Sequence, residues 1–93
     1  PLGEAEIKQI VQLQVEGIAT MLKANDVDLQ LTPAAIELIA AEGFDPQFGA
    51  RPIKRALQRL VLNRLSEQII ARTIQKDKPI VVDVKDGLLV FTN

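Results

Sequence analysis

Apolar residues in the first quarter of the chain recur every three or four positions, which is the spacing of one face of an α-helix. This pattern predicts a helix over about residues 4–24. Glu4 and Glu6 fall in its first turn, where the helix dipole favours acidic side chains. Gly17 weakens the middle of the helix by roughly 1 kcal/mol relative to alanine. The expected buried face, with Val15 beside it, consists of Ile7, Ile10, Val11, Ile18, Met21 and Leu22.

Strict alternation of apolar and polar residues over 27–31 predicts a half-buried strand. Thr32 can cap a following helix and Pro33 can open it. That helix ends near Gly43, whose freedom to adopt a positive φ favours a helix stop. Its expected buried residues are Ile36, Ile39 and Ala40.

The loop that follows is rich in residues that shape the backbone. Asp45-Pro46 disfavours helix and predicts a turn, and Gly49 supplies a second conformational break. Phe44 and Phe48 are expected to hold the loop against the core rather than to bind a ligand.

A third helix is predicted after this loop. Pro52 fits its first position, where the missing N–H is no loss. Arg51 therefore leaves the loop just before the helix, beside backbone N–H groups that favour anions. The helix is expected to reach about residue 62, and a fourth helical pattern follows, with Asn63 able to cap its start. The apolar positions of the two helices are Ile53, Ala56, Leu57, Leu60, Val61, Leu65, Ile69 and Ile70.

The last part of the chain predicts a β-hairpin. Strands over 80–85 and 88–92 are joined by Asp86-Gly87, the strongest short hairpin signal in the sequence. Because two strands alone are marginally stable, the strand at 27–31 is the natural third member. The expected fold class is α+β, with about four helices packed on a small three-stranded sheet that ends in the hairpin.

The first hairpin strand is unusually apolar. Val81, Val82 and Val84 provide more apolar surface than one face of a sheet needs. Two interpretations follow: part of the sheet faces a partner, or an edge strand lies in a tight core.

Composition excludes several kinds of chemistry. The 93 residues suit one small domain, and they include no Cys and no His, so a disulfide framework, a thiolate metal site and the usual proton shuttle are absent. The sequence also has no glycine-rich phosphate loop and no anchored acidic pair, so a self-contained active site is not expected. A net charge of −1 provides no field for nucleic acid or an anionic membrane. The apolar runs are far too short for a membrane span and no signal-peptide pattern opens the chain, so a cytoplasmic location is the default.

One run of residues is far more specific than a lone glycine pair: Gly43-Phe44-Asp45-Pro46 through Gly49-Ala50-Arg51-Pro52-Ile53-Lys54-Arg55. It resembles the sensor-2 segment of the Clp-type AAA+ unfoldases. The flanking pieces agree, and they extend the resemblance over essentially the whole chain: Pro1-Leu2-Gly3-Glu4 before the first helix, Leu29-Gln30-Leu31-Thr32 before the second, and a short β C-terminus. The sequence departs from the family at Arg64, where proline is usual, and between 73 and 78, where glycine is common.

The resemblance implies a specific role. Residues 1–93 would form a single C-terminal small domain, or lid, of a larger ATPase, most similar to the lid of the second ATPase ring of the ClpB disaggregases. Arg51 would contact the γ-phosphate of ATP, with Gly49, Ala50 and Pro52 as motif support. The first helix would flank the adenine.

The same resemblance implies the cofactors and partners of the larger protein. Mg and the catalytic groups would lie in an absent large domain, so this fragment would hold no catalytic residue and no metal. Its partners would be that large domain, neighbouring subunits of a homohexamer and, through the parent protein, misfolded or aggregated proteins, but neither nucleic acid nor membrane.

Other interpretations remain open from the residues alone. Arg51 could be a solvated arginine that pairs with Asp45. Lys54, Arg55 and Arg59 could face phosphate or a neighbouring subunit, although a solvated basic helix face is the simpler account. The domain could also be a free-standing protein-interaction module or, with less support from its charge, a nucleic-acid-binding one.

Overall fold

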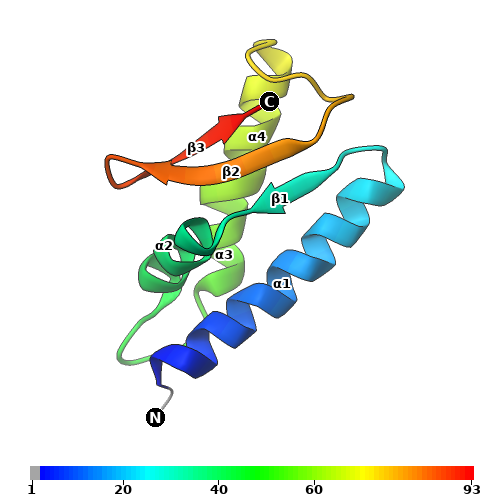
Figure 1. Ribbon diagram of the computed structural model, residues 1–93. Helices are drawn as coiled ribbons and strands as arrows, with labels where there is room; N and C mark the ends of the chain where they lie inside the picture. The colour runs from blue at the N-terminus through cyan, green and yellow to red at the C-terminus, as the bar shows by residue number, and fades with distance from the viewer. Residues whose placement is uncertain (1–2) are drawn as a thin grey trace.

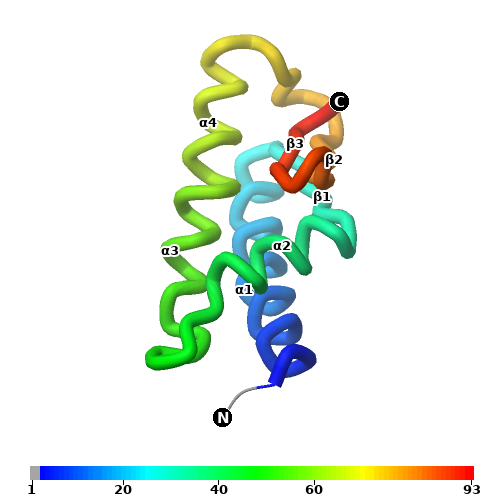
Figure 2. Tube along the Cα trace, turned by 90° about the vertical axis from the view of Figure 1, so that its left-hand side faces the viewer, coloured from blue at the N-terminus to red at the C-terminus, as the bar shows by residue number. Residues whose placement is uncertain are grey.

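The computed structural model describes residues 3–93, which form a group of helices on one side of a three-stranded sheet (Figures 1 and 2). The predicted α+β class is therefore confirmed. The elements, in chain order, are α1 (Glu4–Ala24), β1 (Leu29–Leu31), α2 (Pro33–Gly43), α3 (Ile53–Leu57), η1 (Gln58–Leu62), α4 (Asn63–Ile70), β2 (Ile80–Lys85) and β3 (Leu88–Thr92).

The sheet has the strand order β1-β2-β3, with β1 parallel to β2 and β2 antiparallel to β3. The predicted hairpin is confirmed, and both residues of its turn adopt left-handed conformations, with φ of 53° at Asp86 and 76° at Gly87. The predicted third strand is also confirmed, but β1 covers only the second half of the expected range. Val27 is buried although it precedes the strand.

Only one face of the sheet is closed by the helices. Ile80, Val82, Leu89 and Phe91 are buried on that face. On the other face Val81 and Val90 are half-buried and Leu88 is 62% exposed. Val84 packs partly against the core, so the surplus of apolar residues in β2 divides between the core and an open sheet face. The residues on that open face are Gln30, Val81, Asp83, Lys85, Leu88, Val90 and Thr92.

Helix α1 has the predicted bounds, and Ile7 and Val11 are buried in its first half. The predicted burial of one stripe residue is wrong, because Met21 is 52% exposed. The last turns of α1 extend past α2 (Figure 1), so periodicity alone overstates how far the neighbouring helix covers this stripe. The other stripe residues pack partly against the core: Ile10, Val15, Ile18 and Leu22.

Helix α2 begins and ends where the sequence predicts, but the reason for its end is different. Gly43 is not among the residues with positive φ, and Phe44 continues in an extended conformation. A Cβ atom at Gly43 would lie 3.0 Å from Cγ1 and 3.1 Å from Cα of Ile53. Gly43 therefore permits the close approach of α2 and α3, and the predicted left-handed helix stop is wrong.

The predicted third and fourth helices are one continuous rod, because α3, η1 and α4 follow each other without a break (Figure 2). The described residues thus form three helices rather than about four. The predicted cap at Asn63 is also wrong: Asn63 Oδ1 accepts a hydrogen bond from Gln58 Nε2 at 2.7 Å within the rod. Arg64, unlike proline, retains the N–H that a continuous helix needs.

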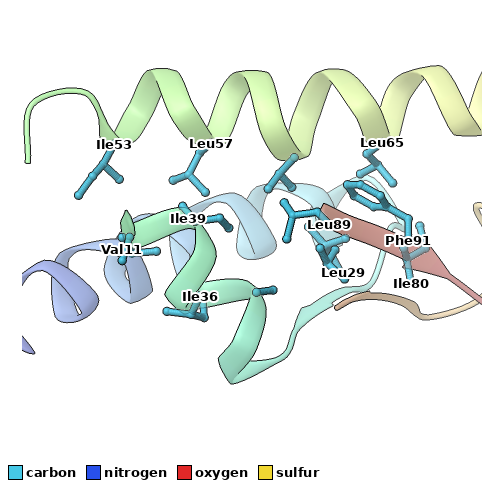
Figure 3. Packing of buried hydrophobic residues seen from close by; sticks show 14 of the residues in the cluster. Val11, Leu29, Ile36, Ile39, Ile53, Leu57, Leu65, Ile80, Leu89 and Phe91 are labelled. Atoms are coloured by element: carbon cyan, nitrogen blue, oxygen red, sulfur yellow. The ribbon is translucent and has the colours of Figure 1, made fainter. Parts of the chain in front are cut away.

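The π-helical segment η1 helps this rod to keep one face on the core. Ile53, Leu57, Val61 and Leu65 are buried at intervals of four residues, and the labelled members point toward Val11, Ile39 and Leu89 (Figure 3). Such a spacing drifts by roughly 40° per step around an ordinary α-helix. The wider π turn reduces that drift in the middle of the rod. The buried stripe ends before Ile70, which is 82% exposed although the sequence pattern includes it among the apolar positions of the helix.

The connector after α4 turns without the glycine that is common in the family, and hydrogen bonds hold it in place. Arg72 takes the left-handed conformation, with φ of 62°, and the following N–H of Thr73 donates to the carbonyl of Gln68 at 3.0 Å. The side chain of Asn93 then ties the connector to the end of β3. Its Oδ1 accepts from the N–H of Gln75 at 3.1 Å, and its Nδ2 donates to the carbonyl of Lys78 at 3.2 Å.

Thr32 joins α2 to the sheet and provides a stability test. Its Oγ1 accepts from the N–H of Ala35 at 3.2 Å, which confirms the predicted cap, and its hydroxyl donates to Asp83 Oδ1 at 2.8 Å. Thr32→Val is expected to lower the free energy of unfolding by about 0.5–2 kcal/mol, because both bonds are lost. Urea unfolding measures this change, and Thr32→Ser, which keeps the hydroxyl, should remain close to the parent chain.

The same substitution changes the titration of Asp83. The N–H of Val84 and the Thr32 hydroxyl hold the pKa of this carboxyl below its ordinary value of 3.8. Its ionised form therefore stabilises the fold above pH 3.8, and this contribution is lost as the pH falls through the folded pKa. In Thr32→Val the folded pKa should rise toward 3.8, as an NMR titration of the carboxyl would show. An unchanged Asp83 pKa would contradict the role of the hydroxyl.

Candidate functional site

The loop between α2 and α3 is braced by the backbone and by one carboxylate. Asp45 and Gly49 exchange two main-chain hydrogen bonds, with N–O distances of 2.9 and 2.6 Å. Asp45 Oδ1 also accepts from the N–H groups of Gln47 and Phe48 at 2.7 and 3.0 Å. Gly49 has a φ of 65°, a conformation that glycine adopts without strain. The predicted turn and the predicted break at Gly49 are both confirmed.

Arg51 leaves this turn immediately before the third helix. Its N–H donates to the carbonyl of Phe48 at 3.3 Å, and the N–H of Ile53 donates to the carbonyl of Ala50 at 3.1 Å. Helix α3 begins at Ile53, one residue later than predicted, and the carbonyl of Pro52 accepts its first helical bond from Ala56 at 2.9 Å. The two predicted support residues flank Arg51 as expected: Ala50 packs partly against the core and Pro52 is half-buried.

The guanidinium of Arg51 is exposed and does not pair with Asp45. Within residues 3–93 the ion pairs are those of Lys8 with Glu37 and Glu4. The suggested Arg51–Asp45 pair is therefore wrong, because the Asp45 carboxylate is occupied by the backbone of its own turn. Instead the Arg51 guanidinium carbon lies 5.6 Å from the centroid of the Phe48 ring.

Arg51 shares a shallow hollow of about 250 Å³ with a second arginine. The hollow is lined by Phe48, Arg51, Pro52 and Arg55. Lys54 and Arg59 are exposed on the same helical rod, but they do not line the hollow. Two guanidinium groups beside an aromatic ring suit an anionic ligand, because arginine offers a fork of donors to phosphate or carboxylate oxygens. Sequence reasoning left Arg55 on a solvated helix face. Its separation of four residues from Arg51 could have identified it as a second arginine beside the same hollow.

The prediction for the two phenylalanines of the loop is wrong. Phe44 is 42% exposed and Phe48 is 52% exposed, so neither ring holds the loop against the core. The loop is braced by the hydrogen bonds of Asp45 instead. Sequence reasoning therefore missed Phe48 as a neighbour of Arg51, and the three-residue separation within a turn was the only available signal.

A second hollow, of about 350 Å³, lies between the start of α1 and the end of α2. Phe44 lines it together with Ile7 and Ala40, and the ion pair between Lys8 and Glu37, at 2.8 Å, lies at the same place. Hydrogen bonding between these two side chains raises the pKa of Lys8 and lowers the pKa of Glu37. Both views place the Arg51 loop at the same end of the molecule as the start of α1 (Figures 1 and 2).

The described part of the chain contains no group of three or more acidic, His or Cys side chains that could hold a metal ion. None of the helices within residues 3–93 combines the length and apolar character needed to cross a membrane. The fold and the loop together define a small α+β module that presents a basic hollow at one end.

The chain belongs to the family described as the C-terminal, D2-small domain of ClpB protein, which matches residues 2–82. The chaperone protein ClpB of Porphyromonas gingivalis is 52% identical over 93 residues, which are 100% of this chain and 11% of that protein. The ClpB of Bacteroides thetaiotaomicron is 47% identical over the same length, again 11% of the relative. The mitochondrial ClpB3 of Oryza sativa is 37% identical over 84 residues, covering 90% of this chain and 8% of the relative. The chain thus spans about a tenth of the length of the curated relatives it matches.

Proposed function

We propose that residues 1–93 form a single lid domain of a hexameric, ATP-driven protein disaggregase. Membership of the ClpB D2-small family supports this proposal, as does identity with chaperone proteins over the whole chain. The observation that carries the nucleotide role is the exposed Arg51 guanidinium, presented by a braced turn in a hollow that also holds Arg55. Arg51 is the residue that contacts the γ-phosphate of ATP, and Gly49, Ala50 and Pro52 shape the loop that presents it.

The position of the loop agrees with such a role. In the family the domain is C-terminal, so the preceding polypeptide joins α1 at its first turn. That turn lies at the same end of the molecule as the Arg51 loop (Figures 1 and 2). ATP would be bound between the preceding large domain and this one, with Mg and the hydrolytic groups supplied by the large domain.

Nucleotide sensing follows from a difference between two ligands. ATP has the γ-phosphate that Arg51 contacts and ADP does not, so the two nucleotides stabilise different positions of the lid. Neighbouring subunits of a homohexamer would transmit these positions around the ring, and the parent protein would use them to pull on misfolded or aggregated polypeptides. The parent would act in the cytoplasm, with no role for nucleic acid or membrane.

A test of this proposal is ATP turnover by the full-length protein that carries Arg51→Ala. Nucleotide affinity and hexamer formation should be measured in the same preparations. If turnover and nucleotide affinity both stay unchanged, Arg51 is not a nucleotide sensor.

The open sheet face supports one alternative, a free-standing protein-interaction module. Leu88 is 62% exposed there, with Val81 and Val90 half-buried beside it. An interaction module should bind a folded partner without ATP, whereas a lid should show no such binding alone. Nucleic-acid binding by the basic face would instead weaken steeply with added salt.

A further inference from the structure

The contact between Phe48 and Arg51 is the feature of the loop that the proposed function does not explain. The Phe48 ring is 52% exposed, and leaving an aromatic side chain in water forgoes the stabilisation of burial. Its visible contact with a charged group is the Arg51 guanidinium, whose central carbon lies 5.6 Å from the ring centroid. That separation is within the range of a cation–π interaction.

We propose that Phe48 is a positioning residue that holds the Arg51 guanidinium in the orientation needed to contact the nucleotide phosphate. This inference rests on the proposed function, because it assigns Phe48 a role only through Arg51. The guanidinium carbon lies over the Phe48 ring. A cation–π contact uses none of the N–H donors as hydrogen bonds, so these donors stay available to phosphate oxygens.

The backbone holds Phe48 and Arg51 close to each other in the loop. The Phe48 N–H donates to Asp45 Oδ1 at 3.0 Å, and the Phe48 carbonyl accepts from the N–H of Arg51 at 3.3 Å. Both residues therefore belong to one hydrogen-bonded turn, and Gly49 between them adopts the left-handed conformation that this turn requires. The hydrogen bonds of the loop itself therefore hold the backbones of the two residues close to each other.

The benefit of this arrangement is preorganisation. A free arginine side chain samples many rotamers, and ordering it on a ligand costs conformational entropy. A ring that already restricts the side chain reduces that cost. The gain applies to a ligand that reaches Arg51, which under the proposed function means ATP and excludes ADP.

The other exposed phenylalanine of the loop provides a matched control. Phe44 lines the hollow between α1 and α2, where it has no cation–π contact with an arginine among the described residues. Replacing either ring with leucine removes the π face while retaining apolar bulk. The two variants therefore share the chemistry of the change and differ in their contact with Arg51.

The test uses the full-length protein with Phe48→Leu, Phe48→Tyr and Phe44→Leu, and it measures kcat and KM for ATP together with the Kd for ADP. Phe48→Leu is expected to lower kcat/KM by about two- to fivefold, the effect of losing one exposed cation–π contact. Phe48→Tyr should restore the parent value and Phe44→Leu should retain it. ADP affinity should stay unchanged in all three, whereas a general collapse of the loop would alter ADP binding as well.

A double-mutant cycle separates this inference from the proposed function. In the Arg51→Ala background Phe48→Leu should have no further effect, since the ring acts through the arginine. An equal loss in both backgrounds, or a normal kcat/KM in Phe48→Leu, would overturn the positioning role while leaving the sensor role intact. If Arg51→Ala itself has normal turnover and normal nucleotide affinity, the proposed function fails instead.

Discussion

Arg51→Ala in the full-length protein is expected to slow ATP hydrolysis by about tenfold to a thousandfold, the usual cost of removing one charge that stabilises a transferring phosphoryl group. The side chain is exposed, so the substitution removes the guanidinium group without opening a cavity in the core. The loop should persist, because the bonds from Asp45 to Gln47 and Phe48 do not involve the arginine side chain. Steady-state turnover, with circular dichroism to confirm folding, measures the effect.

Two variants sharpen this experiment. Arg51→Lys keeps the positive charge but loses the planar fork of donors, so it should fall between the parent and the alanine variant. Arg59→Ala removes an exposed arginine from the same helical rod, outside the hollow that Arg51 lines. Its turnover should remain close to that of the parent, provided that the effect depends on the site and not on net charge.

The outcomes lead to different conclusions about the loop. A collapse of turnover in a folded hexamer would identify Arg51 as the nucleotide contact. A loss of hexamers with normal nucleotide affinity would assign the arginine to subunit packing. Normal values for both would make the loop a structural joint and would favour the interaction module.

The largest expected effect on stability comes from the third helix. Leu57, the last residue of α3, is 1% exposed and points into the core (Figure 3). Leu57→Ala should lower the free energy of unfolding by about 2–5 kcal/mol, because it removes buried apolar atoms and leaves a cavity. The total free energy of unfolding of a domain of this size is about 5–14 kcal/mol, so this one substitution would remove a large part of it. Urea unfolding of the 93-residue chain measures the change.

Leu13 supplies the control for that substitution. It is 69% exposed on α1, so Leu13→Ala removes the same atoms from a solvated site. Its free energy of unfolding should change by about 0.5 kcal/mol or less. Similar losses in Leu13→Ala and Leu57→Ala would show that the core does not depend on the packing of the rod.

Local signals in the sequence predicted the parts of the fold that depend on neighbours along the chain. The conformations that a few adjacent residues can adopt explain the bounds of α1 and β3, the Thr32 cap and the Asp86-Gly87 turn. The Arg51 loop was equally visible, since glycine, proline and aspartate define its turns. The nucleotide role proposed for the loop was suggested by the family resemblance, and the experiments above test it.

Burial and contact were decided by the tertiary structure. Periodicity placed Met21 and Ile70 on apolar stripes, but both are exposed because a stripe does not reveal where its covering partner ends. The sequence identified Gly43 as a helix end by local chemistry, whereas its role depends on Ile53, a residue on another helix.

By itself the sequence determined which segments become helix, strand and turn, because those choices depend on backbone preferences over a few residues. Only the tertiary structure decided that residues 53–70 form one continuous rod, since nothing in the packing requires a break at Asn63. It also decided that Phe48 lies beside Arg51 instead of in the core. The physical reason is the same in both cases: burial is a property of two surfaces, and a sequence pattern describes only one of them.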